Sequence, residues 1–182
     1  MLFKRCAPTL LGLCLFIAAQ GRAAEISVSW PAGWTVEALP LAQASAAQVS
    51  VQVRQRAVKN DQAGNPSMVM ELTQTQLTPG HEVNVEAVLM EMRKSIQVDF
   101  ARSGLQSVCT HIRETRLSVV PALETTCTIT QNGVHVMTQT LVAAAAKDMA
   151  WSLSYAGSAQ GYAASREEIM AIRDGLTLKG VP

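Results

Sequence analysis

Residues 122–144, ALETTCTITQNGVHVMTQTLVAA, consist of two extended segments around one tight turn. The turn is Asn132-Gly133, the strongest short hairpin signal in the chain, because a type I′ turn needs positive φ at both central residues. The segments 122–131 and 134–144 are therefore expected to be antiparallel neighbours in a sheet.

Two further strands are expected to extend this hairpin. Residues 106–116 and 149–156 are both predicted strands, and in the second Trp151, Leu153 and Tyr155 share one face because strand side chains alternate with a period of two. The second half of the chain is thus predicted to hold a four-stranded antiparallel meander.

Ahead of the meander, the spacing of apolar residues changes to three and four, which indicates an amphipathic helix over residues 82–102. Glu86 falls in its first turns and Arg102 in its last, as favoured by the helix dipole, and Gly104 follows as a stop. The apolar seam consists of Val85, Leu89, Met92, Ile96 and Phe100.

The first half of the chain is predicted to be extended. Residues 25–30 indicate a strand, Pro31-Ala32-Gly33-Trp34 a tight turn, and residues 35–39 a second short strand. Residues 48–58 and 68–77 both alternate apolar with polar side chains, and the turn-forming residues between them predict a hairpin.

The chain is expected to close with a short loop and a helix. Residues 157–161, with a glycine at each end, are predicted to be a flexible loop. Ser165 with Glu168 three residues later has the spacing of a capping box, which predicts a C-terminal helix. The fold class is therefore α+β, a largely antiparallel sheet with one long central helix and a C-terminal helix.

The first 23 residues have the three-part order of a cleavable signal peptide. Lys4 and Arg5 precede an apolar run that is too short for a membrane span, and small residues precede a cleavage site after Ala23. Lipidation at Cys14 is disfavoured by the bulky Leu13 before it. Residues 24–182 are then expected to form a single domain without a stable membrane anchor.

The mature chain is expected to be mildly acidic. Loss of the three basic residues in segment 1–23, which contains no acidic ones, changes the formal net charge from +1 to −2. No basic stripe remains to neutralise a phosphate backbone, so nucleic acid is not an expected partner.

Two of the four cysteines, Cys109 and Cys127, remain after cleavage. If segments 106–116 and 122–131 are antiparallel and turn near Ser118, these two residues face each other. An oxidising compartment then favours a structural disulfide. Unpaired buried thiols and a redox-active pair are the alternatives, although the C-x-x-C spacing of redox sites is missing.

The order of elements resembles the PsbP/DcrB-like superfamily. The resemblance rests on the strand before Pro31-Ala32-Gly33-Trp34, the single helix between two antiparallel strand groups, and Ala150-Trp151-Ser152-Leu153-Ser154-Tyr155 before a Glu-rich helix. It implies an α/β/α sandwich over nearly the whole mature chain. It also implies no shared catalytic apparatus, and binding, assembly or chaperone-like roles in exported bacterial proteins.

Metal binding has some candidate ligands. His111 shares a predicted strand face with Cys109, and His135 lies on a nearby strand, but oxidised cysteines are not thiolate ligands and two histidines do not complete a zinc site. His81 has no ligand spacing. Thioether coordination of copper(I) is a further alternative, although core packing explains most of the methionines concerned: Met68, Met70, Met90 and Met92.

No catalytic motif is present. Gly-x-Ser-x-Gly, Ser-x-x-Lys and His-Glu-x-x-His do not occur, and in Gly157-Ser158-Ala159-Gln160-Gly161 the serine directly follows the first glycine. We expect no catalytic, cofactor-binding or metal-binding residues, and no cofactor.

The leading hypothesis is a non-enzymatic binding module of the bacterial envelope, periplasmic or secreted, that recognises a protein partner as an inhibitor, immunity protein, chaperone or assembly factor. The first alternative is a periplasmic binder of a small ligand or metal, for which a cavity along the seam of Leu89, Met92 and Ile96 would be evidence. The second is a hydrolase with dispersed catalytic residues.

Overall fold

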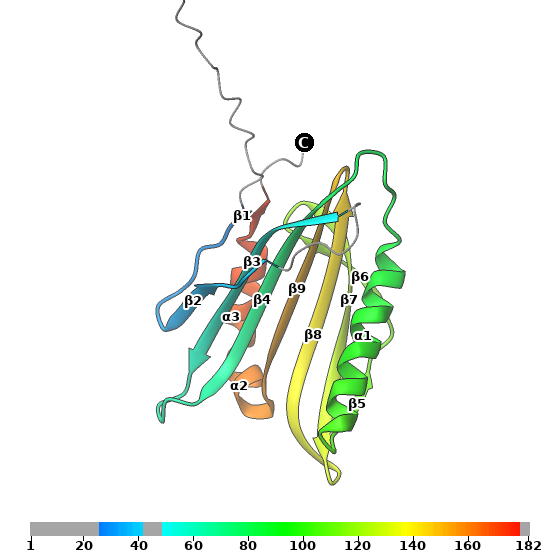
Figure 1. Ribbon diagram of the computed structural model, residues 1–182. Helices are drawn as coiled ribbons and strands as arrows, with labels where there is room; N and C mark the ends of the chain where they lie inside the picture. The colour runs from blue at the N-terminus through cyan, green and yellow to red at the C-terminus, as the bar shows by residue number, and fades with distance from the viewer. Residues whose placement is uncertain (1–25, 42–48, 179–182) are drawn as a thin grey trace, which may run out of the picture.

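The computed structural model describes residues 26–41 and 49–178, and one antiparallel sheet of eight strands dominates it (Figure 1). Seven strands cross the sheet in the order β2-β3-β4-β9-β8-β7-β5, and β6 pairs with β7 on the same edge as β5. The predicted signal peptide lies outside the described residues. The strands are β2 (Trp34–Ala38), β3 (Val49–Asn60), β4 (Pro66–Leu77), β5 (Gln106–Cys109), β6 (Arg113–Leu117), β7 (Val120–Gln131), β8 (Val134–Ala146) and β9 (Met149–Ser158).

The predicted hairpins are confirmed. Strands β7 and β8 are joined at Asn132 and Gly133, whose φ angles of 50° and 79° are both positive, as the type I′ turn requires. Strands β3 and β4 form the other predicted hairpin, and β4 pairs with β9, so the two halves of the chain join into a single sheet. The predicted α+β class with a largely antiparallel sheet is confirmed.

The predicted strand 106–116 is wrong in one respect, because it is split into β5 and β6. The break occurs at Thr110, whose hydroxyl accepts a hydrogen bond from the Thr126 backbone N–H at 3.1 Å. The Thr125 hydroxyl in turn donates to the Thr110 carbonyl at 2.9 Å. Side chains thus replace part of the backbone ladder at this point.

Helix α1 (Val85–Arg102) begins three residues later than expected, because Asn84 caps it. The Asn84 side chain accepts a hydrogen bond from the Ala87 backbone N–H at 2.9 Å. The helix packs over β5, β7 and β8, so it covers one end of the sheet rather than its centre (Figure 1). Its fully buried Leu89 contacts Leu141 and Ala143 of β8.

The opposite face of the sheet carries the main core, which is covered by α2 (Ala159–Ala164) and α3 (Arg166–Asp174) (Figure 1). The prediction of a flexible loop at 157–161 is wrong. Gly157 ends β9, and the Ser158 hydroxyl accepts a hydrogen bond from the Gly161 N–H at 3.0 Å to start α2. Gly157 is needed there, because a Cβ would lie 2.5 Å from the backbone carbonyl oxygen of Ser67.

The predicted C-terminal helix exists, but its capping box is wrong. Ser165 is the N-cap of α3, yet its side chain makes no capping hydrogen bond. The Glu168 carboxylate binds elsewhere: it accepts a hydrogen bond from Trp34 Nε1 at 3.1 Å and pairs with Lys59. Long-range contacts to β2 and β3 therefore replace the local cap.

A second, two-stranded sheet holds the ends of the described chain together. β1 (Ile26–Ser27) pairs with β10 (Thr177–Leu178) in antiparallel register. The predicted strand 25–30 is therefore confirmed only over two residues. Within the described ranges, no helix is long and apolar enough to cross a bilayer.

Candidate functional site

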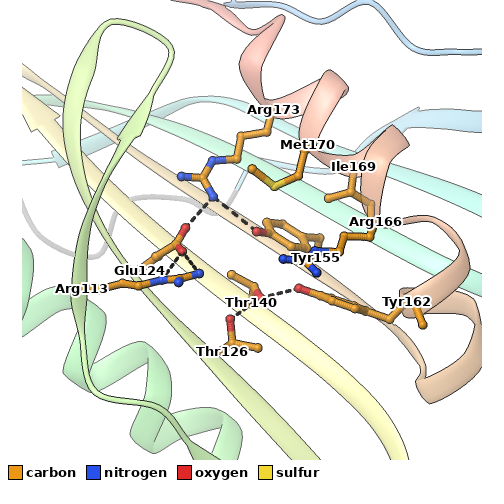
Figure 2. Close-up of a pocket in the computed structure, with 11 residues that line it drawn as sticks. Arg113, Glu124, Thr126, Thr140, Tyr155, Tyr162, Arg166, Ile169, Met170 and Arg173 are labelled. Atoms are coloured by element: carbon orange, nitrogen blue, oxygen red, sulfur yellow. Dashed lines mark hydrogen bonds and ion pairs between the residues drawn. The ribbon is translucent and has the colours of Figure 1, made fainter.

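A cavity of about 440 Å³ lies between the sheet and the two C-terminal helices (Figure 2). Strand side chains that share one face form its floor: Glu124 and Thr126 of β7, Thr140 of β8 and Tyr155 of β9. The register brings them together, because Thr126 pairs with Thr140 and Thr140 with Tyr155. The volume is in the range of small-molecule sites, roughly 300–1,000 Å³.

A buried carboxylate between two guanidinium groups forms one end of the cavity. Glu124 is only 4% exposed and Arg173 only 3%. Glu124 Oε2 accepts a hydrogen bond from Arg173 Nη1 at 2.5 Å, and Oε1 accepts one from Arg113 Nε at 2.6 Å (Figure 2). Both carboxylate oxygens are therefore occupied by charge-assisted hydrogen bonds.

Arg173 is also held by neutral groups. Its Nη2 donates to the Arg116 carbonyl at 3.0 Å and to the Thr115 hydroxyl, and its Nη1 lies 3.4 Å from the Tyr155 hydroxyl. Burial by itself lowers the pKa of Arg173, but the hydrogen bond and charge of Glu124, together with Tyr155, raise it above its ordinary value. The guanidinium thus stays charged inside the protein.

The middle of the cavity is lined by hydroxyl groups and two aromatic rings. The Tyr162 and Thr140 hydroxyls lie 2.7 Å apart, and those of Thr140 and Thr126 lie 2.8 Å apart (Figure 2). The rings of Tyr155 and Tyr162 are stacked, with centroids 5.9 Å apart. Burial raises the pKa of Tyr162 to about 12, so its hydroxyl remains protonated and can donate a hydrogen bond at neutral pH.

Replacing Tyr162 by phenylalanine is expected to reduce the loss of stability at high pH. An unfolded tyrosine ionises near pH 10, whereas folded Tyr162 ionises near pH 12. Its contribution to the free energy of unfolding is therefore complete below about pH 10 and is lost as the pH rises towards about 12. Urea unfolding across this range checks the prediction, together with the ultraviolet absorbance of the phenolate.

The chain contains two tyrosines, so Tyr155→Phe is the matched control. This control variant should retain an ionisation of Tyr162 above pH 10, which Tyr162→Phe lacks, although loss of the Tyr155 hydroxyl lowers the pKa of Tyr162 because Tyr155 helps to raise it. An equal loss of stability in wild type and Tyr162→Phe would contradict the assignment of the step to Tyr162.

Two further arginines lie at the mouth of the cavity. The Arg113 side chain is 70% exposed, although its Nε and Nη2 both face Glu124. Arg166, the first residue of α3, is exposed and lines the same cavity. Within residues 26–41 and 49–178 its side chain makes no hydrogen bond or ion pair. Three arginines and one carboxylate thus line the cavity, which leaves it positively charged.

The histidines singled out in the sequence are not brought together into a site. His81, His111 and His135 are exposed, and the His135 ring is within 2.9 Å of the Thr138 hydroxyl on its own strand. In the part of the chain that the structure describes, no three His, Cys, Asp or Glu side chains are grouped to hold a metal ion.

The methionines are separated by the sheet. Met68 and Met70 are buried in the core beneath α2 and α3, whereas Met92 packs against the cluster under α1. Met90 is 43% exposed. They do not form a common set of thioether ligands.

The α1 seam proposed as a ligand cavity is packed against the sheet. Leu89 is fully buried, and Met92 and Ile96 pack with it against Leu123 and Leu141. The cavity that contains Glu124 lies on the other face of the sheet.

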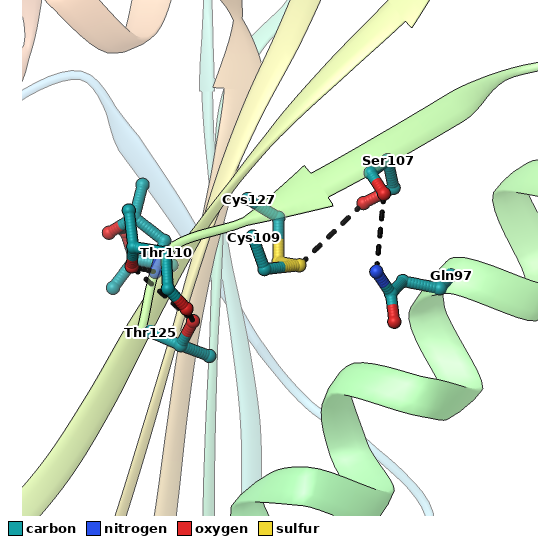
Figure 3. The surroundings of a disulfide bond; sticks show 8 residues. Gln97, Ser107, Cys109, Thr110, Thr125 and Cys127 are labelled. Carbon is teal, nitrogen blue, oxygen red and sulfur yellow. Dashed lines mark hydrogen bonds between the residues drawn. A yellow bond between two sulfur atoms is a disulfide. The ribbon is translucent and has the colours of Figure 1, made fainter. Parts of the chain in front are cut away.

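Cys109 and Cys127 face each other in the register of β5 and β7, as expected, and are joined by a disulfide (Figure 3). Cys127 is fully buried. Helix α1 approaches this bond, because Gln97 Nε2 donates to the Ser107 carbonyl at 3.2 Å. The disulfide thus fastens the short edge strand β5 to β7 beside α1.

Sequence reasoning did not single out Glu124, Arg173 or Tyr162. A signal existed for the first two. Glu124 occupies an inward position two residues from Ala122 on a strand, and Arg173 adjoins the apolar stripe of Ile169 and Ile172 on α3. Ionisable residues at inward positions are expected to be paired with each other.

The sequence of the chain matches a known protein family. A family model described as a domain of unknown function, DUF4946, matches residues 25–178. The chain belongs to this family. None of the curated proteins matches the sequence of the DUF4946 chain.

Two solved structures share the fold of the DUF4946 chain. Cyanobacterial PsbP (CyanoP) from Synechocystis sp. PCC 6803 is similar with a TM-score of 0.57 and 9% identity, over 92% of this chain and 98% of that one. LpqN, involved in cell envelope biogenesis of Mycobacterium tuberculosis, is similar with a TM-score of 0.54 and 14% identity, over 88% and 87%. The chain therefore has the PsbP/DcrB-like fold, and the resemblance predicted from the sequence is confirmed.

Proposed function

We propose that the DUF4946 chain is an exported, non-enzymatic binding module of the bacterial cell envelope, periplasmic or secreted. The signal peptide predicted over residues 1–23 supports export. The fold supports a place in the cell envelope by analogy, because it is shared with LpqN, a protein involved in cell envelope biogenesis.

The cavity under α2 and α3 is the observation that carries the proposal. Its carboxylate, Glu124, has both oxygens occupied by arginine donors, and the raised pKa of Tyr162 keeps that hydroxyl protonated. Groups held in this way are poorly placed to exchange protons with a substrate, whereas the exposed Arg113 and Arg166 that line the same cavity can pair with a ligand. The cavity is therefore assigned to binding.

A protein partner is the second candidate, favoured by the other face of the sheet. Among the described residues, no helix covers β2, β3, β4 and β9 on the side that carries α1 (Figure 1). Val58, Val69 and Ala156 are neighbours there and are only half-buried. Arg56 and Glu71 flank them as an ion pair. An apolar strip with charged borders is typical of a protein interface. An inhibitor, immunity protein, chaperone or assembly factor would need such an interface.

One co-purification experiment separates these surfaces. The protein, expressed with its own signal peptide and tagged at its C-terminus, is recovered from the envelope fraction, and bound species are identified by mass spectrometry. Met170→Trp narrows the cavity, Val69→Arg charges the uncovered sheet face, and Val98→Trp on α1 is the control. Met170 and Val98 are matched, because both are helical and are 38% and 42% exposed.

A specific bound species that is lost in Met170→Trp and kept in Val98→Trp supports binding in the cavity. A protein that co-purifies in a fixed stoichiometry and is lost only in Val69→Arg supports binding of a protein partner at the uncovered sheet face instead. Recovery of the wild-type protein with nothing bound specifically would contradict the binding-module proposal.

A further inference from the structure

The arginines around the cavity create a local excess of positive charge on a nearly neutral protein. Arg113, Arg166 and Arg173 line it together with one carboxylate, Glu124, whereas the whole chain has a formal net charge of +1. The Glu124–Arg173 pair is buried and compensated. The charge available to a ligand is therefore that of Arg113 and Arg166, which reach solvent at the mouth.

Both arginines at the mouth of the cavity have N–H donors without a partner among the described residues. Arg113 uses its Nε and Nη2 towards Glu124, and its Nη1 has no partner among the residues that the structure describes. The guanidinium of Arg166 forms no hydrogen bond with the described residues. A guanidinium group binds carboxylate and phosphate oxygens through several N–H donors in one plane. The mouth of the cavity thus suits an anionic head group.

The wall beside these arginines is apolar. Tyr162 presents its ring, and Ile169 and Met170 present aliphatic and thioether side chains from α3 (Figure 2). The hydroxyl of Tyr162 is already bonded to Thr140 at 2.7 Å, so the ring leaves mainly apolar surface to a ligand. A purely inorganic anion would leave this surface without a contact.

The size of the cavity limits what fits. At about 440 Å³ it is near the lower end of small-molecule sites, too small for a two-chain lipid. We propose that it binds a small amphipathic organic acid, with the anionic group at Arg113 and Arg166 and the apolar body against Tyr162, Ile169 and Met170. This inference rests on the proposed function and specifies its ligand class.

Titration calorimetry of the intact exported protein tests the inference with three probes. Octanoate has both the anionic group and the apolar body, octan-1-ol has only the body, and inorganic phosphate has only the charge. Octanoate is expected to bind saturably at one site, and octan-1-ol at least about tenfold more weakly, since one charge-assisted contact accounts for about that factor. Inorganic phosphate is expected to show no saturable binding.

Arg166→Gln is the decisive variant, because the side chain is exposed and has no partner whose loss would unfold the protein. It should weaken octanoate binding about tenfold or more and leave octan-1-ol binding unchanged. The matched control is Arg102→Gln at the end of α1, on the opposite face of the sheet, which should change neither.

Absence of saturable octanoate binding, equal binding of octanoate and octan-1-ol, saturable binding of phosphate, or an unchanged octanoate affinity in Arg166→Gln would each overturn the inference. The co-purification experiment tests the proposed function separately from the ligand class. If co-purification recovers a species that Met170→Trp abolishes while octanoate does not bind, the binding module stands and the organic-acid class is wrong.

Discussion

Replacing Arg173 by methionine is expected to lower the free energy of unfolding by about 3–5 kcal/mol, the usual cost of removing one partner from a buried ion pair. Arg173 and Glu124 are 3% and 4% exposed, and their side chains are joined by a hydrogen bond of 2.5 Å. Methionine keeps an unbranched apolar side chain in place of the aliphatic part of Arg173, so the loss reports mainly on the missing guanidinium, its ion pair with Glu124 and its hydrogen bonds to neutral groups. Urea unfolding at neutral pH measures it.

The double variant Glu124→Gln/Arg173→Met separates charge from packing. It should be less destabilised than the sum of the two single variants, because each single variant removes the buried charge that compensates the other one most directly. Arg166→Met is the matched control on the same helix, and its exposed side chain predicts a change within about 0.5 kcal/mol. Strict additivity in the double variant would show that Glu124 and Arg173 do not depend on each other.

The sequence carries enough information for the sheet, because its signals are local. Positive φ at Asn132 and Gly133 is a property of two adjacent residues, and the alternation in β4 and β9 is read within a single strand. Helix α1 follows the same logic, except that its start depends on the Asn84 cap rather than on the acidic Glu82 before it.

The predicted capping box was wrong because the contacts that replace it are not local. Ser165 and Glu168 have the correct spacing, but the Glu168 carboxylate binds Lys59 and Trp34, which are more than one hundred residues away in the chain. A local rule cannot weigh a cap against a partner that only the folded sheet supplies. The folded structure brings Lys59 and Trp34 within reach of Glu168, so the carboxylate binds them instead of the helix end.

Only part of the candidate site could be predicted, because some of its contacts join residues that are far apart in the sequence. The pairing of Cys109 with Cys127 follows from two neighbouring strands and their turn, so its register could be worked out. The cavity joins β7 to α3, and Glu124 meets Arg173 across 49 positions. An inward arginine indicates that some partner exists, but its identity depends on how α3 crosses the sheet.

Loss of the Cys109–Cys127 bond is expected to lower the free energy of unfolding by about 3 kcal/mol, because the bond closes a loop between residues 18 positions apart and restricts the unfolded chain. The Cys109→Ala/Cys127→Ala variant removes the bond without leaving a polar atom at the fully buried Cys127. Urea unfolding of both proteins, with and without a phosphine reductant, measures the difference. Edge strand β5, which this bond ties to β7, should also show faster amide hydrogen exchange.

The reductant separates the effect of losing the disulfide bond from the effect of replacing the two cysteine side chains. It should destabilise the wild-type protein to about the level of the double alanine variant and have no effect on that variant, since no other cysteine pair is expected after residues 1–23 are removed. Intact mass after alkylation without reductant should show no modified cysteine in protein recovered from the periplasm. Alkylation of both cysteines there, or equal unfolding of wild type with and without reductant, would mean that the thiols are free and that strand pairing alone holds β5 in place.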